Sequence, residues 1–262
     1  YEDVVDELSS RIKRIGTVYR PPIETQTDLG NVLKRRLFEE IKEDAKLSIE
    51  MEIRKYIDNY GDYVDKDLLK SFDKSYPFHP YYLELLKFLL ENNTNLQNTR
   101  DAIRLSRMVI RKLWSSRPSR SLILPSDINV VDKEFRTILL QNFNEFSDAV
   151  DEIEKITKGS EIHRDLADYI FLSTYVYSLG ADPKGLKAKL PDSKKIVTAV
   201  LDPVYLGKIS LNPAEIKVRL TEMTEQSQDM SKVLPYLLSS DDRYWFSSFK
   251  DPLIACKIYR DK

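Results

Sequence analysis

Four regularly spaced arginines are the side chains of this sequence best suited to binding chemistry. Arg100, Arg104, Arg107 and Arg111 follow one another at intervals of four, three and four residues, which places them on one face of an α-helix. Guanidinium groups bind phosphate oxygens through paired hydrogen bonds. The spacing therefore predicts contact with the phosphates of a nucleotide or a nucleic acid. The alternative is a set of ion pairs with Asp and Glu on neighbouring helices.

Charge is distributed unevenly around these arginines. Residues 100–120 hold seven cations and one anion, a local charge of +6, whereas the whole chain carries −1. The remainder of the chain therefore carries −7 and can supply carboxylates to the arginines. A net charge this close to zero gives no overall field that would attract nucleic acid or an acidic membrane.

Two segments resemble parts of an ATP-hydrolysing site in their spacing, but each lacks a residue that the chemistry requires. Gly180 and Gly185 have the spacing of a phosphate-binding loop, but Leu186 stands where the phosphate-binding lysine is needed. Residues 196–202 imitate an apolar strand ending in a magnesium-binding aspartate, but no glutamate follows Asp202. The sequence therefore does not predict ATP hydrolysis by this chain alone.

Histidine and cysteine offer little to catalysis or metal binding. His79 lies between Phe78 and Pro80 without an evident acid or nucleophile beside it, so we expect it to cap the following helix. Two histidines and one cysteine argue against a zinc site of the usual type, and a single cysteine cannot form an internal disulfide. These features, with no apolar run near the roughly 20 residues that span a bilayer, predict a cytoplasmic protein with no membrane partner.

The pattern of apolar residues predicts a mainly α-helical fold. Glycine is scarce, at 7 residues, which favours helices over tight turns. We expect a helix over 1–13, a strand over 15–19, and further helices over 25–44, 47–60, 81–91, 99–115, 132–141, 143–158, 162–179, 193–201 and from Pro213 onward. Gly61, Gly159 and Gly180 are expected to end helices.

The last part of the chain has the element order of a winged-helix module. Helices are followed by two expected strands, 233–238 and 243–246, joined by residues 239–242. We assign this winged-helix-like module to 160–262. Lys217, Arg219 and Arg243 are its candidate nucleic-acid contacts, yet the segment holds 15 cations and 14 anions, which is poor for attracting phosphates. Packing against an ATPase core or another subunit is the alternative.

Three segments resemble a family of large prokaryotic ATPases of the AAA+ superfamily, long classed as a domain of unknown function. They are residues 28–40 with Lys-Arg-Arg-Leu-Phe at 34–38, residues 76–114 from Tyr-Pro-Phe-His-Pro through Asn-Thr-Arg-Asp-Ala-Ile-Arg to Leu-Trp, and residues 199–246 from Ala-Val-Leu-Asp-Pro through Leu-Pro-Tyr-Leu to Arg-Tyr-Trp-Phe. This resemblance implies a P-loop ATPase core upstream of the chain. It also implies a role beside DNA methyltransferases and helicases in defence loci.

The same resemblance implies a division into parts. Residues 1–20 would be the last helix and strand of the ATPase core, 21–158 a helical lid-like region, and 160–262 the winged-helix-like domain. Arg100 and Arg104 match a pair of family arginines and would contact the nucleotide, with ATP and Mg²⁺ as cofactors of the intact protein. The family often has glycine where this chain has Asp101 and leucine where it has Ile103.

Two other functions remain open. The chain could be a DNA-binding regulator that uses its winged helix together with Arg107 and Arg111. It could instead be a non-catalytic assembly module whose arginines dock on an acidic partner or on a second copy of the chain.

Overall fold

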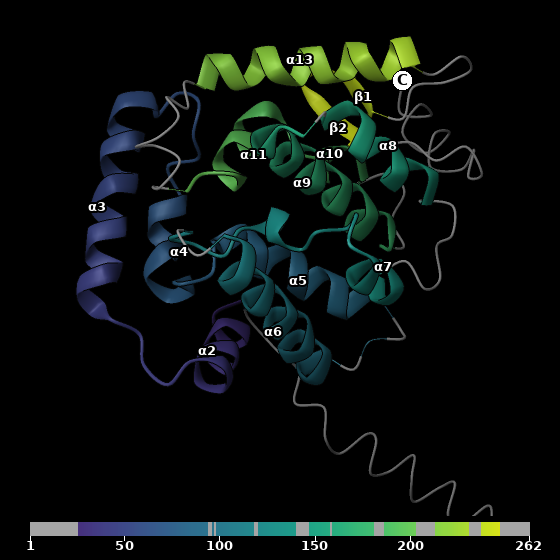
Figure 1. Cartoon of the computed structure of the whole chain (residues 1–262). Coiled ribbons are helices and arrows are strands. Elements are labelled where there is room, and N and C mark those ends of the chain that lie inside the picture. Colours follow the sequence, from purple (N-terminus) through teal and green to yellow (C-terminus); the bar gives the residue numbers. More distant parts are fainter. Residues whose placement is uncertain are drawn as a thin grey trace, which may run out of the picture.

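Helices provide nearly all of the regular structure, packed around one hydrophobic core (Figure 1). The computed structural model describes residues 26–93, 96, 98–117, 120–139, 147–157, 159–180, 186–202, 213–230 and 237–246. Phe72, Tyr82 and Trp245 are among the largest fully buried side chains. The mainly helical fold is therefore confirmed. The expected helix 1–13 and strand 15–19, and with them the proposed end of an ATPase core at 1–20, lie outside the described residues.

The expected helix over 25–44 is wrong, because two helices occupy this stretch: α2 (Gln26–Leu37) and α3 (Glu43–Tyr60). Between them lie Glu39 and Glu40, which would be unfavourable at the negative end of a helix dipole. Glu43 and Asp44, by contrast, lie in the first turn of α3, where the dipole favours them. Phe38 leaves α2 and packs edge-on against Phe78, with ring centroids 6.0 Å apart.

The sequence pattern also misses α4 (Leu68–Ser75), although Leu68 and Phe72 are buried at helical spacing. Gly61 ends α3 as expected, but its φ of −59° is right-handed rather than left-handed. A Cβ at Gly61 would lie 2.8 Å from the carbonyl oxygen of Ile57, so close packing explains this glycine. Gly159 follows α8 (Ser147–Thr157) and has a positive φ of 77°, the left-handed conformation expected of a glycine that ends a helix.

Helix α5 (Pro80–Asn92) begins as the sequence predicts, after the non-helical segment 76–79 that contains a cis Tyr76–Pro77 peptide bond. His79 is the N-cap: its Nδ1 accepts a hydrogen bond from the Tyr81 amide at 3.1 Å, and its Nε2 lies 2.9 Å from the Thr198 carbonyl oxygen. His79 is fully buried, which lowers its pKa to about 3. The structural role expected for His79 is confirmed.

Helix α9 (Glu161–Ser178) lies at the centre of the fold (Figure 1). It contacts α5 and the 3₁₀ turn η1 (Pro125–Asp127) from the preceding part of the chain, and α8, α11 and β2 as well. The hydrophobic core therefore continues across residue 159 rather than dividing there. The remaining helices are α6 (Asn98–Ser116), α7 (Lys133–Leu139), α10 (Leu186–Lys189), α11 (Ser193–Ala199) and α13 (Pro213–Met230).

The described part of the chain ends with a hairpin of β1 (Leu237–Ser240) and β2 (Arg243–Phe246), paired antiparallel with Ser240 opposite Arg243. Asp241 and Asp242 form its tight turn, and both have positive φ angles, 52° and 56°. This turn places the first strand later than the expected 233–238; residues 233–236 lie outside the described part. Helix α13 runs across β1, α8 and α9 (Figure 1). Its side chains Ile216, Leu220 and Met223 are buried at helical spacing.

None of the described helices is long and apolar enough to cross a lipid bilayer.

Candidate functional site: an arginine-bearing helix

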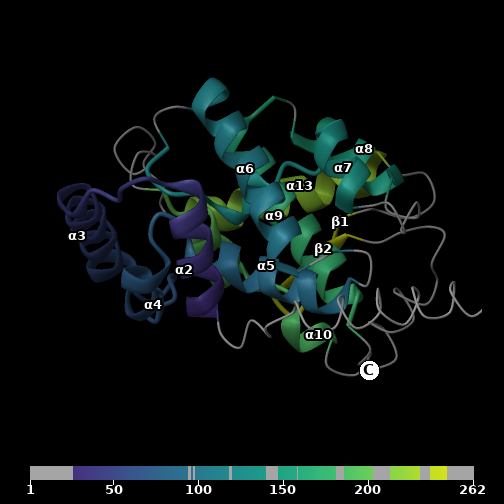
Figure 2. The ribbon, with the colours of Figure 1, turned by 90° about the horizontal axis from the view of Figure 1, so that it is seen from below.

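Helix α6 carries the predicted arginines on its outer side, and we call Arg100, Arg104, Arg107 and Arg111 the arginine face. All four are exposed, whereas Ala102, Leu105, Ser106 and Val109 on the inner side are buried. The inner side packs against α2 and α5 (Figure 2). Ser106 is held there because its hydroxyl shares a 2.9 Å hydrogen bond with the buried Tyr82 hydroxyl. Packing of the inner side thus fixes the direction of the arginine face, as the spacing predicts.

Only part of the arginine face is neutralised by carboxylates of the described residues. Arg111 Nη2 lies 3.0 Å from Glu134 Oε2 on α7, but both side chains are largely exposed, so the pair is weak. The neighbouring Lys112 pairs with Asp132. Among the described residues, no ion pair joins Arg104 or Arg107 to a carboxylate. The alternative of ion pairs therefore holds for Arg111 and leaves the middle of the face available to other anions.

The arginine face borders a shallow hollow of about 460 Å³. Its lining consists of the four arginines together with Ile103, Met108 and Glu134. Four guanidiniums against one carboxylate give the hollow an excess of positive charge. Chemically, such a surface can bind phosphate oxygens by charge-assisted hydrogen bonds. It offers no proton acceptor for catalysis other than the ion-paired Glu134.

The other predicted cationic contacts lie away from α6, on α13 and the hairpin. Arg243 Nη1 donates to the Leu190 carbonyl oxygen at 2.6 Å and lies 3.5 Å from Asp192, so it holds the hairpin to the chain before α11. Arg219 is paired with Glu215 on its own helix and also approaches His163. Lys217 is exposed. The structure therefore does not bring these three residues together with the arginine face.

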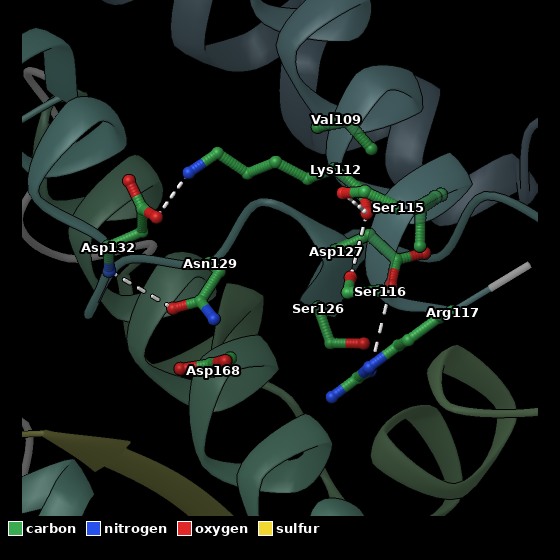
Figure 3. Close-up of a pocket in the computed structure, with 11 residues that line it drawn as sticks. Val109, Lys112, Ser115, Ser116, Arg117, Ser126, Asp127, Asn129, Asp132 and Asp168 are labelled. Carbon is green, nitrogen blue, oxygen red and sulfur yellow. Dashed lines mark hydrogen bonds and ion pairs between the residues drawn. The ribbon is translucent and has the colours of Figure 1, made fainter.

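A second site, a polar pocket, lies beside the C-terminal end of α6 (Figure 3). This polar pocket has a volume of about 300 Å³ and lies between the end of α6, η1 and α9. It is lined by Val109, Lys112, Leu113, Ser115, Ser116, Arg117, Ser126, Asp127, Asn129, Asp132 and Asp168. Neither histidine nor cysteine is among them.

Two arginines from the basic segment enclose the aspartates beside this pocket. Arg117 Nη1 and Arg120 Nη2 donate to the two oxygens of the Asp165 carboxylate, at 2.9 and 2.7 Å. Arg120 Nη2 also lies 3.4 Å from Asp127 Oδ1. Asp127 Oδ2 accepts the Leu124 amide at 2.7 Å and so fixes the 3₁₀ turn. These residues form an internal ion-pair network.

Burial changes the proton affinity of two carboxyls in this region. Desolvation raises the pKa of Asp127 to about 7, with Arg120 opposing the rise and Asp165 adding to it. Burial likewise raises the pKa of Asp168 well above its ordinary value. Asp168 Oδ1 and Ser126 Oγ are buried without a hydrogen-bond partner among the described residues. The pocket therefore offers polar groups to a small ligand, although no nucleophile and base in it are joined by a described hydrogen bond.

Sequence reasoning misses this network, although a signal for it exists. Asp165 and Asp168 stand three residues apart within the largely apolar 162–179 pattern, so one face of this helix carries two carboxylates. Buried carboxylates need cationic or hydrogen-bonding partners, and Arg117 and Arg120 are two of the seven cations in the basic segment 100–120. Asp202 is also a buried carboxylate with a structural role. Its Oδ2 accepts hydrogen bonds from the Ser121 and Leu122 amides at 3.1 and 3.2 Å. Residues 193–199 before it are helical rather than a strand.

No group of histidine, cysteine, aspartate and glutamate in the described ranges is arranged to hold a metal ion.

The chain is thus a mainly helical domain that presents an arginine-bearing helix. Residues 24–246 match the family described as DUF499 second domain. This match covers most of the 262 residues, and the chain belongs to that family. Searches of the curated proteins and of the solved structures give no match.

Proposed function

We propose that this chain is the helical lid and winged-helix portion of an AAA+-type ATPase, and that it supplies Arg100 or Arg104 to a nucleotide held by another domain. The observation that carries the proposal is the arginine face itself. Its guanidiniums are exposed on one side of a well-anchored helix and border a hollow with excess positive charge. Catalysis of phosphoryl transfer depends on positioning and on electrostatic stabilisation, to which such preorganised cations contribute.

Family membership is compatible with this division of labour. The family is described as a second domain, which fits a chain that works beside another one. In the proposal, the upstream core binds ATP and Mg²⁺ and performs the hydrolysis, while this chain contributes cations and contacts. The order of α9, α11, α13 and the β1–β2 hairpin supports the winged-helix assignment of 160–262. The setting is cytoplasmic and prokaryotic, in DNA-related processes such as defence.

The test uses the intact ATPase that contains this chain. Replacing both Arg100 and Arg104 by alanine is expected to lower kcat for ATP hydrolysis at least about tenfold, because a cation on the transferring phosphate is worth that much or more. The matched control is Arg54→Ala, since Arg54 is an exposed arginine on α3 that pairs with Glu50. Unchanged kcat in the double variant, or ATP turnover by this chain alone, contradicts the proposal.

DNA binding by the chain as a regulator is the second candidate, and one observation favours it. Arg107 is exposed, and no ion pair to it is described, so it can meet a phosphate without first losing a carboxylate. Against it, Arg219 and Arg243 make contacts within the chain. A third candidate, assembly of several copies through the arginine face, predicts oligomers in the absence of nucleotide and DNA.

A further inference from the structure

An exposed tryptophan continues the arginine face toward the end of α6. Trp114 follows Arg111 by three residues and Arg107 by seven, so its side chain projects from the same side of the helix. Its exposed fraction is 84%, the highest of the large hydrophobic side chains described. Indole is costly to leave in water, and Trp245, the other tryptophan of the chain, is almost fully buried. The outer side of α6 thus presents guanidiniums followed by a free aromatic ring.

This sequence of groups has a specific chemical complement. A phosphodiester chain satisfies the guanidiniums, and a base can stack on the indole. Bases in a duplex are covered on both faces by their neighbours, so only an unpaired base can use Trp114 in this way. The surface from Arg100 to Trp114 extends over ~21 Å of helix, which is enough for several nucleotides. An acidic peptide would satisfy the arginines but supplies no reason for the tryptophan.

We propose that Arg107, Arg111 and Trp114 form a binding surface for single-stranded nucleic acid, with phosphates on the arginines and one base stacked on the indole. This proposal goes beyond the nucleotide role of Arg100 and Arg104, because it concerns the other end of the helix. Arg107 carries most of the phosphate contact. Arg111 can contact a phosphate only after its ion pair with Glu134 breaks, so the Glu134 carboxylate competes with the nucleic acid for Arg111.

Because Glu134 competes for Arg111, the proposal predicts the sign of one mutational effect on binding. Glu134 Oε2 lies 3.0 Å from Arg111 Nη2 and 3.8 Å from Lys112 Nζ, so Glu134→Gln frees cationic charge at the surface without touching the tryptophan. Binding of a strand should therefore become tighter in Glu134→Gln. A purely structural role for the Arg111–Glu134 pair gives no such gain.

The experiment measures binding of a labelled short oligothymidine to the full chain by fluorescence anisotropy at about 50 mM and about 200 mM salt. Trp114→Ala is expected to weaken affinity by roughly 5- to 100-fold, the range for loss of one stacking aromatic, while Trp114→Phe retains most of it. Arg107→Ala should reduce the slope of log K against log salt by about 0.7, the value for one phosphate of a single strand. Arg54→Ala is the control that removes an exposed arginine elsewhere.

Tryptophan emission supplies an independent readout. Quenching by the oligonucleotide should be absent in Trp114→Phe, because Trp245 is buried. Oligouridine in parallel distinguishes RNA from DNA, and either one supports the proposal. The proposal is overturned by no binding at about 50 mM salt, by Trp114→Ala binding as well as wild type, by tighter binding of a duplex, or by equal binding of polyglutamate. None of these outcomes depends on ATP hydrolysis, so the nucleotide role of Arg100 and Arg104 stands or falls separately.

Discussion

The guanidinium of Arg120 lies 2.7 Å from the carboxylate of Asp165, and both side chains are buried. Arg117 contacts the same carboxylate, so Asp165 pairs with two cations of the basic segment. Asp165→Asn removes the closest carboxylate of the buried Arg120 and of Arg117, and we expect a loss of about 3–5 kcal/mol in the free energy of unfolding. Urea denaturation measures it. Arg136→Ala, which removes the more exposed pair with Asp151, should cost below about 1 kcal/mol. Equal losses in the two variants would contradict the buried network.

His79 should make the protein acid-sensitive. Its pKa is lowered to about 3 in the folded state because the ring is buried, whereas an unfolded histidine titrates near 6.5. The unfolded state therefore takes up a proton first, and stability is lost as pH falls from about 6.5 toward 3, at up to ~1.4 kcal/mol per pH unit. His79→Asn keeps a capping oxygen but cannot titrate. The free energy of unfolding should fall less between pH ~6.5 and ~4.5 in this variant, and an unchanged slope refutes the assignment.

Asp127 should make stability depend on pH in the opposite direction to His79. Burial raises its pKa to about 7, so the folded state keeps a proton that the unfolded state loses near pH 4. Its contribution to stability is complete below about pH 4 and is lost as pH rises to about 7. Asp127→Asn keeps an acceptor for the Leu124 amide and removes the titration, although its amide now faces Arg120 and Arg117. The measurement is the slope of unfolding free energy between pH ~4 and ~7, which should become more positive.

Gly159 should be sensitive to substitution through its backbone alone. Its φ is 77°, and nothing lies within 4 Å of a Cβ placed there. Gly159→Ala should cost about 1–2 kcal/mol, because a left-handed conformation is strained for alanine. Gly159→Asn should cost less, since asparagine tolerates that conformation. Thermal unfolding gives the comparison; a melting temperature that is equal in both variants and wild type excludes backbone strain at this position.

Arg104 and Arg107 should contribute little to folding. Both are exposed, and no ion pair to either is described, so alanine at each position should change the free energy of unfolding by at most about 0.5 kcal/mol. This result matters for the binding experiments, because it separates loss of binding from loss of structure. A destabilisation above about 1 kcal/mol would show instead that these arginines are structural.

The sequence predicts the arginine face because its evidence is local. Helical spacing fixes which side chains share a face, and burial of Ala102 and Val109 opposite the arginines follows from the same period. The helix starts at Pro80 and Glu161 are also local, since each follows a capping side chain, His79 or Ser160. Such features need no knowledge of distant contacts.

The buried network could not be placed from the sequence, because its partners come from separate parts of the chain. Asp165 is 48 residues from Arg117 and 45 from Arg120. Only the packing of α9 against η1 brings them together. The break between α2 and α3 was likewise hidden, because Phe38 and Ile41 continue the apolar spacing while Glu39 and Glu40 act through the helix dipole.

The position of α9 has a consequence for synthesis of the protein. The helices α2 to α7 leave the ribosome before α9 does, yet α5 and η1 pack against α9. Their apolar surfaces stay uncovered until residues 161–178 have been made. Completion of the core is therefore delayed during translation until α9 has been made.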